Sequence, residues 1–209
     1  MVPLLEPDRG YALWAETYPP RAHNELMRVE QSAMALLWKG LPVERALDVG
    51  TGTGRNLGLL AGEGVTTRLG LDRSTAMLKR ADARRGRLIA GDATALPFAA
   101  EAFDLLLASL MAGDLSELSD LARFTREASR VLRRGGSLVY SDFHPSWAER
   151  RWERTFESAD GRKWRLPYHP HALSDHRAAL DGAALETVAI EEPLLDDRPV
   201  LVVLRAVKR

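Results

Sequence analysis

Cysteine is absent from the 209 residues of this chain. Its absence excludes disulfide bonds, zinc–thiolate centres and catalysis by a thiol. A net charge is lacking as well, since 29 Lys and Arg residues balance 29 Asp and Glu residues. No overall electric field therefore draws the protein toward nucleic acid or an anionic membrane, and we expect neither partner.

Long apolar runs are also missing. No stretch approaches the roughly 18 residues that a membrane-spanning helix needs, and the segment from Met1 to Arg9 is unlike a signal peptide. These absences predict a soluble, cytoplasmic protein with no membrane span. The composition that remains, 45% hydrophobic and 28% charged, is typical of one globular domain spanning residues 1–209.

Strand-like and helix-like segments alternate along most of the chain. Short apolar stretches typical of strands lie at 45–49, 68–71, 88–90, 103–109 and 137–141. Helical spacing is found at 25–38, 55–61, 75–83 and 118–132, and the pair Gly135-Gly136 is expected to end the last of these helices. Such alternation predicts parallel βαβ units with helices on both faces of the sheet.

The C-terminal part breaks this alternation. After a predicted helix at 172–182, two strand-like stretches at 185–190 and 200–207 follow with no helix between them. They predict an antiparallel hairpin. We therefore expect an α/β, Rossmann-like, single-domain fold with a mostly parallel sheet of seven strands.

A glycine-rich turn, from Asp48 to Gly54, directly follows the first predicted strand. Its glycines permit a sharp turn and a close approach to a ligand, as in sites for dinucleotides and for adenosyl cofactors. The dinucleotide motif G-x-G-x-x-G would need glycine at position 55, where the chain has Arg55. The acid at position 48 also suits a pyrophosphate poorly. Both features favour a nucleoside that carries an amino acid over NAD.

Two further acids stand at the ends of the next two predicted strands. Asp72 lies 18 residues beyond Gly54, where a carboxylate can accept hydrogen bonds from ribose hydroxyls. Asp92 follows the third strand and would receive the amino group of an adenine. Each acid alone would be interpreted as a turn or capping residue. Three acids at the ends of three successive strands indicate a binding site.

The ordered set of motifs resembles the class I S-adenosylmethionine-dependent methyltransferases. The matching segments are Ala46 to Gly54, Leu71-Asp72 with Ser74 and Met77-Leu78, Gly91-Asp92-Ala93 with Leu96-Pro97-Phe98, and Phe103-Asp104. Within that family, the group that includes the ubiquinone/menaquinone-biosynthesis and malonyl-carrier-protein methyltransferases is the most similar. The resemblance covers residues 10–142 and extends to the final hairpin.

The resemblance implies that S-adenosyl-L-methionine is the cofactor and S-adenosyl-L-homocysteine its product. The implied cofactor-binding residues are Tyr11, Tyr18, Asp48, Gly50, Thr51, Gly52, Asp72, Arg73, Met77, Asp92, Ala93 and Ser109. It also implies an N-terminal lid and helix over 1–40, a cofactor-binding core over 41–142, an acceptor-site insertion over 143–170, and a C-terminal helix and hairpin over 171–209.

The methyl acceptor is expected to be a small molecule bound by the 143–170 insertion. Arginines 151, 154, 162 and 165 in it would suit an acidic acceptor. Four of the five histidines lie between 144 and 176, and we take His144 and His171 as candidate catalytic bases, because histidine transfers protons near neutral pH. No metal site is expected.

Two alternatives stay open at this point. One is an NAD-type oxidoreductase on the same architecture. The other is a catalytically silent protein that binds S-adenosylmethionine without transferring its methyl group, which fold analogy does not distinguish from an enzyme.

Overall fold

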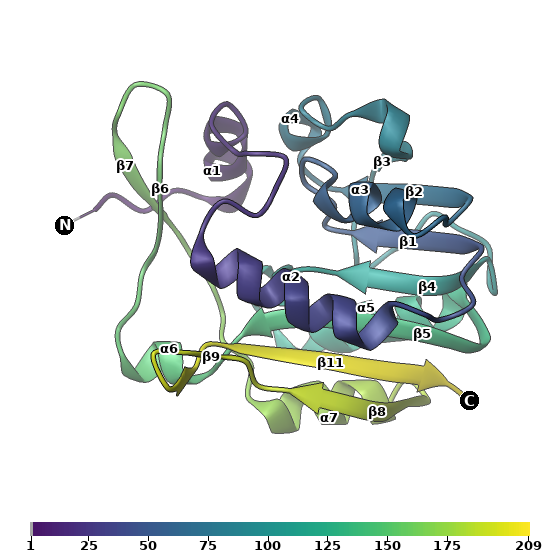
Figure 1. The fold of residues 1–209 in the computed structure, drawn as a ribbon. Helices are drawn as coiled ribbons and strands as arrows, with labels where there is room; N and C mark the ends of the chain where they lie inside the picture. Colours follow the sequence, from purple (N-terminus) through teal and green to yellow (C-terminus); the bar gives the residue numbers. More distant parts are fainter. Residues whose placement is uncertain (1) are drawn as a thin grey trace.

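The computed structural model describes residues 2–209, which form a seven-stranded sheet with helices on both faces (Figure 1). From one edge to the other, the strands are β3 (Arg87–Ala90), β2 (Thr67–Asp72), β1 (Arg45–Val49), β4 (Phe103–Ala108), β5 (Leu132–Phe143), β11 (Leu201–Lys208) and β8 (Leu185–Glu191). The first five strands in this order, β3, β2, β1, β4 and β5, are parallel to one another. Strand β11 runs antiparallel to both its neighbours. The predicted fold class is confirmed, including the C-terminal hairpin.

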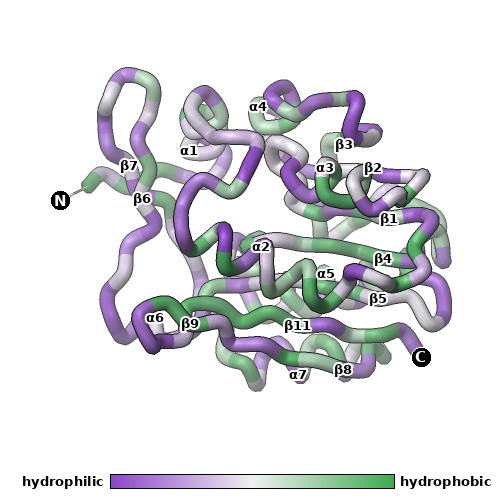
Figure 2. Tube along the Cα trace, in the orientation of Figure 1, coloured by the Kyte–Doolittle hydropathy of each residue, from purple (hydrophilic) through white to green (hydrophobic). Residues whose placement is uncertain are grey.

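The sheet is buried between two layers of helices. On one face lie α2 (Glu25–Trp38) and α3 (Arg55–Gly62), and on the other α5 (Leu118–Val131) and α7 (Leu173–Asp181). All six residues of β4 are buried, with Leu105 packing toward α2 and α3 and Leu106 toward α5 and α7. Figure 2 shows this concentration of hydrophobic residues along β4 and β11. A run without polar alternation is typical of a central parallel strand covered on both faces.

Two element boundaries differ from those expected. The predicted helix at 75–83 is divided into α4 (Thr75–Leu78) and a 3-10 turn, η1 (Ala83–Arg85), because the Asp82 carboxylate accepts a hydrogen bond from the Arg84 N–H and starts a new turn. The pair Gly135-Gly136 does not end α5. That helix stops at Val131, and β5 begins at once and bends at Gly135, whose φ is +76°.

The insertion over 143–170 folds as a short helix, α6 (Ser146–Glu149), and a hairpin of β6 (Arg154–Glu157) and β7 (Lys163–Leu166). In Figure 1 this hairpin stands beside α1 (Pro7–Trp14) at the carboxyl ends of the parallel strands. The chain before α1 pairs with β7, since Leu5 N–H donates to the Arg165 carbonyl at 2.9 Å. We call α1 and the β6–β7 hairpin together the cap.

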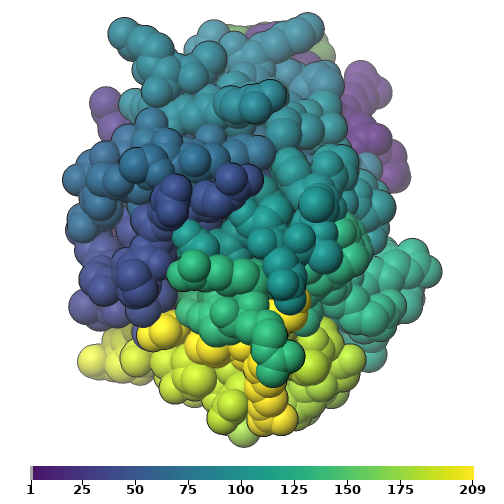
Figure 3. All heavy atoms as spheres, turned by 90° about the vertical axis from the view of Figure 1, so that its right-hand side faces the viewer, coloured from purple at the N-terminus to yellow at the C-terminus, as the bar shows by residue number. Residues whose placement is uncertain are grey.

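The opposite end of the sheet, where the chain terminates, faces the viewer in Figure 3, and the N-terminal residues appear there only at the margins. A second hairpin, β9 (Leu194–Leu195) and β10 (Arg198–Pro199), connects β8 to β11. Among residues 2–209 no helix is both long enough and apolar enough to cross a membrane.

Candidate active site

A cavity of about 440 Å³ lies beneath the cap, at the carboxyl ends of the parallel strands. Ligand sites of open α/β sheets lie at this edge, and the volume is in the range of small-molecule sites. Ten of the twelve predicted cofactor-binding residues line it: Tyr11, Tyr18, Gly50, Gly52, Asp72, Arg73, Met77, Asp92, Ala93 and Ser109. The tertiary structure therefore brings most of the sequence-predicted site together.

Asp48 and Thr51 are the two that do not reach the cavity wall. The Asp48 side chain is buried, and its carboxylate accepts hydrogen bonds from Thr51 Oγ1 at 2.6 Å and Asn56 Nδ2 at 2.9 Å. Burial raises the pKa of Asp48 to about 6. These contacts hold the glycine turn against the start of α3. Asp48 thus supports the turn from behind, and its contact with the cofactor stays a prediction.

The Asp72 carboxylate is held in place by two backbone donors. Its Oδ2 accepts from Gly52 N–H at 2.7 Å and its Oδ1 from Ser74 N–H at 2.8 Å. Burial raises the pKa of Asp72. A Cβ atom on Gly52 would meet nothing within 4 Å, and both Gly52 and Asp72 line the cavity. The arrangement presents a fixed acceptor of hydrogen bonds next to room for a ligand.

Asp92 is oriented by its own turn. Its Oδ1 accepts from both Thr94 N–H at 2.7 Å and Thr94 Oγ1 at 2.8 Å, and the hydrogen bond from the backbone lowers the pKa of Asp92. Within residues 2–209, Oδ2 of Asp92 has no hydrogen-bond partner. A charged oxygen on the cavity wall is thus available to an amino group.

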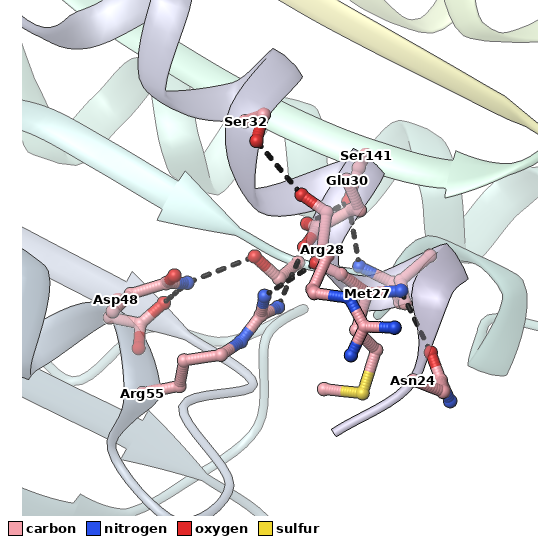
Figure 4. A network of polar contacts seen from close by, with 11 residues as sticks. Asn24, Met27, Arg28, Glu30, Ser32, Asp48, Arg55 and Ser141 are labelled. Atoms are coloured by element: carbon pink, nitrogen blue, oxygen red, sulfur yellow. Dashed lines mark hydrogen bonds and ion pairs between the residues drawn. The ribbon is translucent and has the colours of Figure 1, made fainter. Parts of the chain in front are cut away.

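Arg55 is a cavity residue that sequence reasoning noted only as a departure from the dinucleotide motif. Its Nη2 lies 2.7 Å from Glu30 Oε2, and Glu30 Oε1 accepts from Ser141 Oγ at 2.7 Å (Figure 4). Burial opposes the charge of Arg55, but the Glu30 carboxylate outweighs burial and raises the pKa of Arg55. The sequence offered one signal for this pair, because Glu30 is an acid on the apolar face of the helix predicted at 25–38 and needs a cationic partner there.

Aromatic rings form the roof of the cavity. Trp14 stacks on Phe156 with ring centroids 5.0 Å apart and meets the Tyr18 ring edge-on at 4.9 Å. Trp14 and Tyr18 belong to the predicted lid segment, and Phe156 belongs to the β6–β7 hairpin. The two parts of the cap are therefore joined by aromatic packing directly above the cavity.

Known proteins match a segment of the chain that supplies part of the cavity wall. Residues 47–140 match the methyltransferase domain family. This segment is similar to methyltransferase domains. This match confirms the resemblance inferred from the motifs and favours the methyltransferase over the NAD-type oxidoreductase.

The curated relatives of this segment carry the names of more than one methyltransferase activity. A demethylmenaquinone methyltransferase of Beutenbergia cavernae is 41% identical over 110 residues, which are 51% of this chain and 44% of that protein. A malonyl-[acyl-carrier protein] O-methyltransferase of Methylococcus capsulatus is 42% identical over 110 residues, 50% of this chain and 39% of that protein. The chain thus spans less than half the length of these curated relatives.

A solved structure of similar fold covers more of the chain. The S-adenosylmethionine-dependent methyltransferase from Mesorhizobium loti superposes with a TM-score of 0.70 at 23% identity, covering 86% of this chain and 98% of that one. At this level of identity the likeness establishes the fold of the matched segment and its surroundings, and no more.

Two residues of the cap and one of the matched segment form a half-buried ionic cluster in the wall of the cavity. Arg154 Nη1 lies 2.6 Å from Asp114 Oδ1, and Arg154 Nη2 donates to the Tyr11 hydroxyl at 2.5 Å. The Tyr11 hydroxyl donates in turn to Asp114 Oδ2 at 2.5 Å. The three side chains come from β6, from the turn η2 (Ala112–Asp114) after β4, and from α1. No local sequence pattern could have grouped them.

The two predicted catalytic histidines do not reach the cavity. His144 Nε2 lies 3.0 Å from Glu192 Oε1, and the buried His171 places Nε2 2.9 Å from the Leu115 carbonyl oxygen. His144 lies in the predicted insertion and His171 directly follows it, but position in the sequence does not determine where a side chain points. The histidine that lines the cavity is His23, edge-on to Tyr18, and burial lowers its pKa. Within residues 2–209, no group of three or more His, Asp or Glu side chains is placed to hold a metal ion.

Proposed function

We propose that this protein transfers a methyl group from S-adenosylmethionine to a small-molecule acceptor. The observation that carries the proposal is the carboxylate of Asp72, held by two backbone N–H groups beside Gly52 on the cavity wall, in a segment similar to methyltransferase domains. A carboxylate so placed accepts hydrogen bonds from the two hydroxyls of a ribose.

The cavity residues fit the other parts of the cofactor in order along the wall. Asp92 Oδ2 would accept from the adenine amino group, with Arg73, Met77 and Ala93 beside the ring. The backbone of Gly50 and Gly52, with Ser109, would follow the methionine part toward the sulfur. Arg55 would bind the carboxylate of the methionine, as its planar guanidinium suits a carboxylate.

The work left to the protein is alignment and exclusion of water. S-adenosylmethionine supplies an electrophilic methyl group on a positively charged sulfur. A nucleophile held in line with the sulfur–methyl bond needs no covalent help from the protein. The cap would serve the exclusion of water, because its stacked rings Trp14 and Phe156 line the cavity.

Calorimetric titration of the full chain tests the proposal. S-adenosylhomocysteine and S-adenosylmethionine should bind with dissociation constants between about 1 μM and 1 mM, the usual range for enzyme substrates. NADH should bind at least about 100-fold more weakly. The proposal fails if neither adenosyl compound binds at 1 mM, which is on the order of the upper limit of that range. Binding without methyl transfer to any acceptor would instead indicate the catalytically silent protein.

A further inference from the structure

We propose that Arg154 binds an anionic oxygen of the methyl acceptor, and that the acceptor is a small aromatic acid. The proposal rests on the proposed function, since it concerns the second substrate of the same cavity. It selects one of the five arginines of the insertion and gives it a partner of defined charge and shape.

Arg154 keeps donors that no other residue uses. Of its five N–H groups, one on Nη1 points to Asp114 and one on Nη2 to the Tyr11 hydroxyl. The fully enclosed polar side-chain atoms without a partner in residues 2–209 are Asp142 Oδ2, Arg165 Nε and His176 Nε2. Since Nε of Arg154 has no partner and is not among them, it is not fully enclosed, and Arg154 is a residue of the cavity wall.

Each oxygen of the neighbouring acid already has a partner within the protein. Asp114 Oδ1 is taken by Arg154 and Oδ2 by the Tyr11 hydroxyl. Burial raises the pKa of Tyr11 well above its usual value, so this hydroxyl stays neutral and keeps donating. The N–H groups of the cluster that have no partner therefore belong to Arg154. Both oxygens of Asp114 are hydrogen-bonded within the cluster.

Three aromatic rings of the cavity wall already lie beside a cation. The guanidinium carbon of Arg154 lies 5.4 Å from the Tyr11 ring centroid, 5.7 Å from Trp14 and 5.8 Å from Phe143. Cation–π attraction at these three rings is thus used by the protein itself. A positively charged amine would enter against Arg154, whereas an anionic oxygen would meet its free N–H groups in a site with little water.

The shape of the wall favours a flat acceptor. Trp14 and Phe156 stack with planes 18° apart, and Phe143 lies 5.0 Å from Trp152 beside them. The segment after α1 is joined to β6 by a hydrogen bond of 2.9 Å from Thr17 Oγ1 to the Glu157 carbonyl. Cofactor and acceptor share a cavity of about 440 Å³, so the acid must be small.

Matched ligand sets test the proposal on the full chain saturated with S-adenosylhomocysteine. Benzoate, salicylate, cinnamate and indole-3-acetate are each compared by calorimetry at pH 7.5 with the amide of that acid and with the primary amine that replaces its carboxylate. We expect at least one acid to bind about 20-fold or more tightly than its amide and its amine, the usual worth of charged hydrogen bonds. Equal or tighter binding of the amide or amine in every set overturns the proposal. So does the absence of acid binding at 10 mM, on the order of ten times the usual upper range for substrates. Failure of S-adenosylhomocysteine itself to bind would count against the proposed function.

Variants separate recognition from folding. Arg154→Gln should weaken the preferred acid about 20-fold while S-adenosylhomocysteine affinity stays within about threefold. Arg154→Lys keeps a cation beside Asp114 but loses the planar fork, so it should fold even where the glutamine variant does not and should weaken the acid by about tenfold. The control is Arg162→Gln, on the same hairpin, where the side chain is exposed and paired with Asp160. Unchanged acid affinity in a folded Arg154 variant overturns the proposal.

Discussion

The backbone N–H of Gly52 donates a hydrogen bond of 2.7 Å to Asp72 Oδ2, across 20 residues of sequence. This contact joins the two strongest motifs of the chain, the glycine turn and the acid that ends the second strand. It fixes the direction of the carboxylate before any ligand arrives, and preorganisation of this kind lowers the entropic cost of binding.

Removing the Asp72 carboxylate should abolish most of the cofactor affinity. Asp72→Ala deletes two charge-assisted acceptors, and we expect S-adenosylhomocysteine to bind about 30-fold or more weakly, measured by calorimetry. Asp72→Asn keeps one acceptor oxygen, so its affinity for S-adenosylhomocysteine should lie between those of wild type and Asp72→Ala. Asp82→Ala, at an acid that does not line the cavity, serves as control. Wild-type affinity in a folded Asp72→Ala protein would show that the ribose lies elsewhere.

The buried Asp48 predicts an unusual dependence of stability on pH. Its pKa is raised to about 6 in the folded state, so between the usual value near 4 and pH 6 the folded protein holds a proton that the unfolded chain has lost. The contribution of Asp48 to the free energy of unfolding is therefore fully present below pH 4 and is lost as the pH rises through 6.

Asp48→Asn isolates this contribution. Relative to wild type, the variant should gain on the order of 1–3 kcal/mol in free energy of unfolding between pH 4 and pH 7. Urea denaturation of both proteins at several pH values measures the gain, and all other titrating groups cancel in the difference. A difference that is independent of pH would mean that Asp48 titrates normally.

The pair Glu30 and Arg55 should be strongly coupled. Glu30 is fully enclosed, so Arg55→Gln leaves a buried charge without its partner and should cost about 3–5 kcal/mol of stability. Adding Glu30→Gln to it should restore most of the loss, as a double-mutant cycle by urea denaturation would show. Cofactor affinity should stay low in the double variant, because Arg55 itself is missing. Additive losses in stability would exclude the coupling.

The two histidines predicted as catalytic bases should prove dispensable for chemistry. His144→Ala removes a ring paired with Glu192 outside the cavity, and turnover with an acid from the matched sets should stay within about twofold of wild type, since no substrate contact is lost. His171→Ala leaves the buried Leu115 carbonyl without its donor and should lower stability by about 1–3 kcal/mol, again with little effect on turnover. A loss of turnover beyond 100-fold, about 3 kcal/mol of transition-state stabilisation, in a stable variant would restore either histidine as a catalytic base.

The sequence by itself determined the sheet and the cofactor half of the cavity. Apolar runs and turns mark where each parallel strand ends, and parallel strands end at a common edge, so Gly50, Gly52, Asp72 and Asp92 had to lie close together. Residue type and spacing were sufficient there because the positions are set by the backbone.

Only the tertiary structure decided which side chains face the ligand and which distant segments meet. Asp48 turns inward because Thr51 and Asn56 satisfy its carboxylate, and His144 turns outward to Glu192. The cluster of Tyr11, Asp114 and Arg154 joins three segments spread over more than 140 residues. Such directions and long-range contacts follow from the packing of the cap on the sheet, which no local pattern encodes.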